Sequence, residues 1–137
     1  MLALWIKSIE KTLIKITILV IIFSVFLEIN YHNFVNYLIF LVFVYIIGFL
    51  YILYKTTLKV EIYDDFINIK TLFSLRTIKY SNIMDFFSNV GYLQKKFGLI
   101  SIYIITKNKN YVLKDMPDGK KILSDIEMKF KNKNINL

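Results

Sequence analysis

The pattern of apolar and polar positions divides the chain into two halves with different periods. From Phe34 to Tyr54 there is no charged residue, and these 21 residues would form a helix of about 31 Å, close to the thickness of a bilayer's hydrocarbon core. After Thr56, apolar and polar residues alternate, which is typical of strands with one wet face. The sequence therefore predicts a membrane hairpin in residues 1–55 and a small α+β domain in residues 56–131.

A second, less apolar span is predicted before this segment, over about residues 12–31, so that the two spans cover about 12–31 and 34–54. Its uncharged centre, Ile16–Leu27, holds only twelve residues. Lys15 and Glu28 must therefore lie near the two ends of the span, where a lysine can snorkel toward the headgroups. No small-x-small cleavage site follows, so we expect an uncleaved anchor rather than a signal peptide.

The first eleven residues are amphipathic, and their place is open. Met1–Lys11 either lies in the membrane interface with Trp5 at headgroup depth or forms the first turns of the first span. Gly48 in the second span would permit a close approach of the two helices. Two buried helices of a soluble core are the alternative, and the run Ile29–Tyr54, 26 residues without Lys, Arg, Asp or Glu, argues against it.

The distribution of lysines predicts the orientation of the hairpin. Positive residues cluster on the cytoplasmic side of membrane proteins. The connection between the spans has no Lys or Arg, whereas lysines flank both other ends of the spans. Both termini are therefore expected in the cytoplasm and the connection outside. The flanking lysines are Lys7, Lys11, Lys15, Lys55 and Lys59.

The domain is predicted to hold six or seven short antiparallel strands and one C-terminal helix. The helix should begin at Pro117, and residues 132–137 should form a frayed tail. An apolar stripe on this helix, Ile122, Leu123, Ile126 and Phe130, would cover the open side of the sheet. The strands are expected at Leu58–Ile62, Phe66–Ile69, Leu75–Tyr80, Met84–Val90, Leu99–Thr106 and Tyr111–Lys114.

A group of residues in the second half of the domain carries a family resemblance. It comprises Ile83, Tyr92-Leu93-Gln94-Lys95-Lys96-Phe97-Gly98, Ile102, Ile104, Thr106, Leu113 and Met116-Pro117-Asp118. With the element order from about Leu58 to Phe130, it resembles the bacterial pleckstrin-homology-like (PH-like) domains of small two-span membrane proteins of Gram-positive bacteria. The resemblance implies a PH-like, partly open antiparallel β-barrel capped by the C-terminal α-helix. The glycine that the family has between the second and third strands is replaced around Thr71-Leu72-Phe73.

Candidate catalytic chemistry is sparse. The chain has no cysteine, its four glycines are scattered, and its one histidine, His32, lies in the connection between the spans. Asp64-Asp65 and Asp115 with Asp118 look like carboxylate pairs, but each is expected at a turn or helix start, where Asp side chains accept hydrogen bonds from backbone N–H groups. We therefore expect no enzyme activity, no cofactor and no metal.

A basic loop between Gly91 and Gly98 is the candidate binding site. Lysines with apolar neighbours suit an anionic headgroup, and each lysine near a membrane surface contributes about 1 kcal/mol. A solvated loop with its aromatic residues packed into the barrel is the alternative. The candidate lipid- or partner-binding residues are Tyr92, Leu93, Lys95, Lys96 and Phe97.

Charge and topology narrow the function further. Residues 55–137 carry 15 Lys/Arg against 8 Asp/Glu, a net charge of +7. We expect membrane lipids as partners, with other membrane proteins or a membrane-active peptide as further candidates. The sequence shows no basic recognition helix, so we expect no nucleic acid partner. Small two-span proteins of this kind resemble self-immunity and accessory proteins of leaderless, membrane-active bacteriocins. A structural or regulatory subunit of a membrane transporter complex is the alternative, and the oligomeric state is open.

Overall fold

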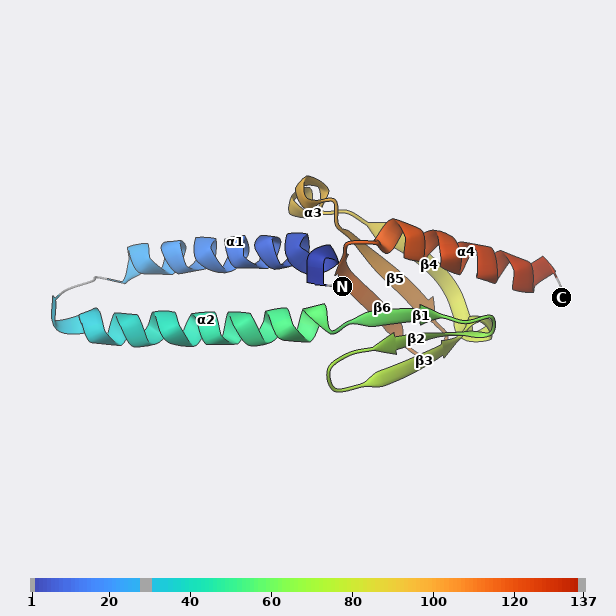
Figure 1. Cartoon of the computed structure of the whole chain (residues 1–137), viewed down its shortest axis with the longest axis horizontal. Coiled ribbons are helices and arrows are strands. Elements are labelled where there is room, and N and C mark those ends of the chain that lie inside the picture. The colour runs from blue at the N-terminus through green and yellow to red at the C-terminus, as the bar shows by residue number, and fades with distance from the viewer. Residues whose placement is uncertain (1, 28–30, 136–137) are drawn as a thin grey trace.

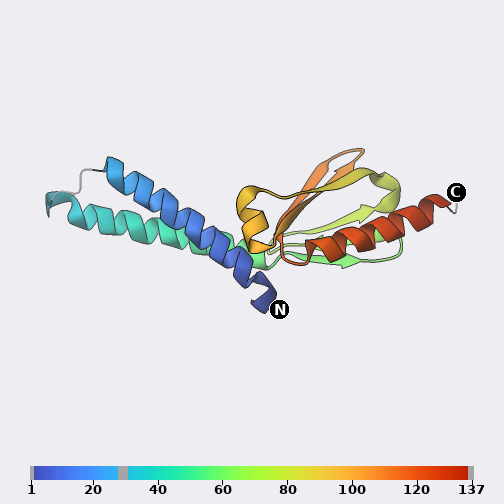
Figure 2. The same cartoon turned by 90° about the horizontal axis from the view of Figure 1, so that it is seen from above.

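Two long helices stand side by side at one end of the molecule. The structure is a computed structural model that describes residues 2–27 and 31–135. Helix α1 (Leu2–Phe26) and helix α2 (Phe34–Thr56) pack against each other in opposite directions (Figures 1 and 2), and a short 3-10 helix, η1 (Tyr31–Asn33), precedes α2. Among the described residues, one helical segment, Tyr31–Thr56, has the length and composition to cross a membrane, and most of it is exposed. The helical part precedes an open α+β arrangement.

The α+β part contains two three-stranded antiparallel sheets. The first sheet has the order β1-β2-β3, from Lys59–Ile62, Phe66–Lys70 and Leu75–Lys79. The second has the order β4-β5-β6, from Ile83–Asn89, Ile100–Thr106 and Asn110–Met116. A 3-10 turn, η2 (Tyr80–Asn82), joins the sheets, and a six-residue helix, α3 (Tyr92–Phe97), joins β4 to β5.

Helix α4 (Gly119–Ile135) packs against both sheets. It contacts β1 of the first sheet and β5 of the second (Figure 2), so it covers the open side between them. Ile126 is fully buried, and the rings of Phe130 and Phe86 pack edge to face with 5.4 Å between their centroids. The apolar stripe of α4 thus covers the open side between the sheets, as the sequence predicts.

The hydrophobic core extends from the sheets into the first turns of α1. Trp5, which is 7% exposed, belongs to the same buried cluster as the strand residues, and Ile9 packs against it. Apolar burial of this kind is the main driving force of folding. The strand and helix members of the cluster include Ile67, Ile69, Ile78, Tyr80, Ile102, Ile104, Leu113, Ile122 and Ile126.

The structure decides one open alternative and corrects two other boundaries. Of the two alternatives for the first eleven residues, it has the second: residues 2–11 form the first turns of one continuous helix, and Trp5 is buried against the domain. The expected loop between Gly91 and Gly98 is helix α3. Helix α4 continues through Ile135, so residues 132–135 are helical; residues 136–137 and 28–30, which include Glu28, lie outside the described residues.

Candidate functional site

A buried carboxylate, Asp115, lies where the helical hairpin meets the domain. The register between β5 and β6 shifts between Ile100 and Ile102, because Ile100 pairs with Met116 while Ile102 pairs with Leu113. One extra residue of β6 therefore opposes β5, which is a β-bulge, a device that redirects a side chain. Asp115 sits in this bulge with φ of +54°, a left-handed conformation that Asp tolerates better than most residues. The bulge aims the carboxylate at the hairpin.

Three side chains from three other elements donate hydrogen bonds to this carboxylate. The Nζ of Lys11 on α1 pairs with Oδ1, and the Nζ of Lys55 on α2 pairs with Oδ2. The Nε2 of Gln94 on α3 donates to Oδ1 at 2.7 Å. Both lysines and the aspartate are buried. Asp115 and these donors are called the Asp115 junction here, and the junction ties both helices of the hairpin to the domain.

Further hydrogen bonds hold the donors in place. Gln94 also donates from Nε2 to Ser101 Oγ at 2.6 Å, and its Oε1 accepts from the backbone N–H of Gly91 at 2.8 Å. Lys55 Nζ donates to Thr12 Oγ1 at 3.3 Å, and Thr12 donates in turn to the carbonyl of Ser8 at 2.9 Å. A buried charge is tolerated only when such partners satisfy it.

The junction sets the ionisation of Asp115. Burial raises the pKa of this carboxyl, but the hydrogen bonds from Lys11, Lys55 and Gln94 outweigh it and lower the pKa to about 2. Asp115 is therefore ionised at neutral pH. Two ammonium groups share this one carboxylate, so the ionic cluster keeps one surplus positive charge.

A polar pocket of about 410 Å³ opens beside the junction, between α1 and α3. Its cationic side chains are Lys11 and Lys15 of α1, and Ser101 and Gln94 contribute polar groups. Lys15 is exposed and makes no ion pair within the described part of the chain. Ammonium and hydroxyl donors beside the tyrosine rings of Tyr92 and Tyr103 suit a phosphate-bearing headgroup. Both amide hydrogens of Gln94 are already donated to Ser101 and Asp115.

The structure divides the five predicted site residues into two groups. Tyr92 and Leu93 line the polar pocket, and Tyr92 is 89% exposed. Lys95 and Lys96 are exposed and Phe97 is half-buried, and none of these three lines the pocket. Sequence reasoning therefore found one edge of the pocket but not its cations, which come from α1.

The expected role of Asp115 was wrong. It lies inside β6 rather than at a helix start, and its side chain pairs with lysines rather than with backbone N–H groups. No local signal marks this, because its partners are 104 and 60 residues away in sequence. Asp64 and Asp65 pair with Lys129 and Lys133 of α4, and within residues 2–27 and 31–135 no group of three or more His, Cys, Asp or Glu could hold a metal ion.

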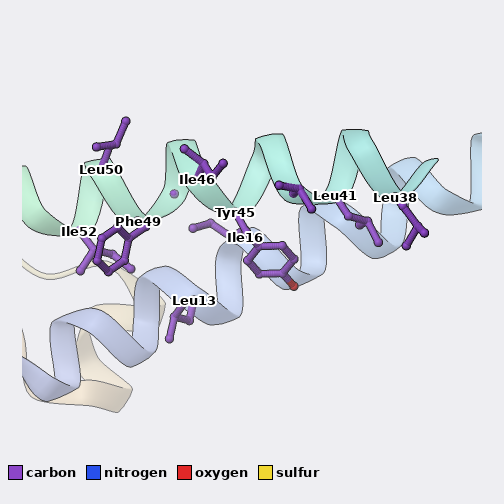
Figure 3. A pocket seen from close by; sticks show the side chains of 11 residues that line it. Leu13, Ile16, Leu38, Leu41, Tyr45, Ile46, Phe49, Leu50 and Ile52 are labelled. Carbon is purple, nitrogen blue, oxygen red and sulfur yellow. The ribbon is translucent and has the colours of Figure 1, made fainter. Parts of the chain in front are cut away.

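A larger, apolar cavity of about 720 Å³ lies between α1 and α2, as Figure 3 shows. Ile16 of α1 faces Gly48 of α2, and a Cβ at residue 48 would lie 2.4 Å from Cδ1 of Ile16. Gly48 thus allows the close helix approach expected of it. Leu13, Leu38 and Tyr45 are among the side chains that line the groove between the helices.

Comparison of the chain with protein-family models, with curated proteins and with solved structures gives no match. The resemblance to bacterial PH-like domains therefore stays a prediction. The function must be argued from the site alone.

Proposed function

We propose that the chain is an integral membrane protein with two spans, both termini in the cytoplasm, and a PH-like, non-enzymatic binding domain on the inner membrane face. The apolar, mostly exposed surface of α2 supports the membrane placement, because such a surface is unfavourable in water. Helix α1 packs along α2, and Ser24 Oγ lies 2.5 Å from the hydroxyl of Tyr37, a polar contact of the kind that joins helices within membranes. The strand order and the terminal helix support the PH-like barrel.

The Asp115 junction is the observation that carries this proposal. It fastens the domain to the ends of both spans, so the domain keeps one orientation toward the bilayer instead of moving on a flexible linker. A tethered module meets its ligand at a high effective concentration, and weak intrinsic affinity then suffices. The polar pocket lined by Lys11 and Lys15 lies beside the junction and would bind an anionic headgroup.

The role that we propose for this module is protection of the producing cell against a membrane-active bacteriocin. Such peptides are typically cationic, so residues 55–137, with their net charge of +7, would not attract them electrostatically. The apolar groove between α1 and α2 offers a different route, because it would meet the peptide within the bilayer. The spans then matter more for protection than Lys95 and Lys96.

Expression of the whole protein in a sensitive strain tests this role. The inhibitory concentration of the cognate peptide should rise, whereas residues 56–137 without the spans should give no protection. A variant with Lys95→Gln and Lys96→Gln is the matched control and should protect as well as the parent. If the full-length protein gives no protection, alone or with the products of its neighbouring genes, the immunity role fails. The transporter-subunit alternative then takes its place.

A further inference from the structure

The turn between β2 and β3 carries apolar side chains at its tip. Phe73 is 83% exposed and Leu72 is 49% exposed, and Leu75 at the start of β3 is 61% exposed. Tight turns usually hold Gly, Asn, Asp, Pro or Ser, because those residues satisfy the backbone at little cost in water. Two large apolar side chains exposed at a turn tip are therefore unfavourable in water and indicate a contact surface.

The turn has a defined shape. The backbone N–H of Thr71 donates to the carbonyl of Ser74 at 2.8 Å, and the two hydroxyl oxygens of Thr71 and Ser74 lie 2.8 Å apart. These contacts close the turn at its base. Leu72 and Phe73 are consequently held outward, away from the core of the domain.

Strand register places this tip beside the end of α2. Helix α2 ends at Thr56, and β1 begins at Lys59, which pairs with Lys70 at the end of β2. Lys70 pairs in turn with Leu75, so the tip between them lies at the end of the sheet nearest α2. Figure 1 shows the β2–β3 turn level with the last turn of α2.

We propose that Leu72 and Phe73 insert into the cytoplasmic leaflet of the bilayer that α1 and α2 span, as a second, peripheral membrane contact of the domain. The inference rests on the proposed membrane placement and adds a lipid-binding element to it. The lipid bilayer is the partner that the chain itself brings to this tip, because the sheet follows α2 directly. Where the bilayer surface meets the end of α2, it also meets the tip. Arg76, one residue beyond Leu75, and the basic charge of the domain favour an anionic leaflet.

The absence of cysteine from the chain permits a sharp test. Three single-cysteine variants of the full-length protein, Phe73→Cys, Met84→Cys and Phe43→Cys, would each carry an environment-sensitive fluorophore in vesicles of phosphatidylglycerol and phosphatidylethanolamine. Met84 is the matched control, because it is 64% exposed but lies far from the hairpin. It is at the start of β4, which pairs with the end of β5 at Thr106, whereas the hairpin lies near the other end of β5, at Ile100. Phe43 is 63% exposed at the middle of α2 and reports on the span.

Lipids with a quencher on the acyl chain should quench the probe at residue 73 at least threefold more than the probe at residue 84. Equal quenching at 73 and 84, with strong quenching at 43, overturns the inference and leaves the membrane placement standing. Weak quenching at 43 overturns the placement itself. If the probe at 73 is shielded from aqueous iodide but unaffected by lipid quenchers, protein covers the tip, and insertion is wrong.

Discussion

Lys55 Nζ, in the last turn of α2, forms an ion pair with Asp115 Oδ2, in the bulge of β6, and thereby joins two elements whose residues are 60 positions apart. Lys11 of α1 binds the other carboxylate oxygen. The same carboxylate therefore contacts both helices of the hairpin. Asp115 thus links both helices to the domain, in addition to the apolar contacts that Trp5 and Ile9 of α1 make with the core.

Replacing Asp115 tests the strength of this junction. In Asp115→Asn the backbone keeps its conformation, because Asn also tolerates positive φ, but two buried ammonium groups lose their counter-charge. The free energy of unfolding of the domain should fall by about 3 kcal/mol, the size typical of a broken buried ion pair. Thermal unfolding in lipid nanodiscs measures this. Asp118→Asn is the control, because Asp118 is exposed, and its effect should stay within about 0.5 kcal/mol; equal effects would contradict the account.

The junction should withstand mild acid. A carboxyl whose pKa is lower in the folded state than in the unfolded state stabilises the fold above its unfolded pKa, and this contribution is lost as the pH falls through the folded pKa. For Asp115 these values are 3.8 and about 2, so its contribution should be constant from pH 5 to 8 and decline below pH 4. Unfolding midpoints of the parent and Asp115→Asn, measured against pH, report it. A difference between them that disappears between pH 5 and 7 would contradict the assignment.

Separating the domain from the hairpin should change what Asp115 does. Residues 56–137 alone lack Lys11 and Lys55 and also lack Trp5, which packs into the core. We expect the fragment to retain its strands and α4 but to melt below the full-length protein. In the fragment, Asp115→Asn should change the free energy of unfolding by less than about 0.5 kcal/mol, because both lysines are gone and the remaining donor, Gln94, can still donate to an amide oxygen. A loss of about 3 kcal/mol there would show that the lysines are not what Asp115 stabilises.

Periodicity was a good guide to the element order and a poor one to the site. The β-branched and aromatic residues of Leu99–Thr106 predict β5, which is Ile100–Thr106. The apolar stripe with Ile126 predicts the covering face of α4. These features depend on local sequence, which fixes side-chain direction in strands and helices. The α3 helix was missed because its six residues are too few to show a helical period.

The Asp115 junction has no counterpart in any local pattern. The sequence interprets Lys11 and Lys55 as topology signals, and that interpretation stays a prediction. Their second role depends on the bulge at Asp115, which arises from the pairing of β5 with β6. Such a contact follows from tertiary structure alone.

The polar pocket predicts a lipid preference. Lys15 lines the pocket without an ion pair to any described residue, so Lys15→Gln should reduce retention of anionic phospholipid on the purified protein about fivefold, the effect of removing about 1 kcal/mol of attraction. Lys121→Gln, an exposed lysine of α4, is the control and should leave retention unchanged. Native mass spectrometry counts the bound lipids. Equal retention by both variants would exclude the pocket as the site.

The membrane orientation can be tested independently of the domain. A reporter that is active only outside the cytoplasm, fused after Leu137, should be silent, because lysines flank the ends of both proposed spans next to the domain. The same reporter fused after Phe26, which truncates the chain between the two helices, should be active. An active fusion after Leu137 would contradict the proposed topology.

A distance measurement across the junction tests the central claim, which is that Asp115 holds the domain in one orientation on the hairpin. Spin labels on Tyr51→Cys in α2 and Lys96→Cys in α3, both exposed sites, would be measured by pulsed electron paramagnetic resonance in nanodiscs. We predict one narrow distance distribution for this pair and a broad one when Asp115→Asn is added, while Asp118→Asn leaves it narrow. A distribution that is already broad with Asp115 present, or that stays narrow in Asp115→Asn, would contradict it.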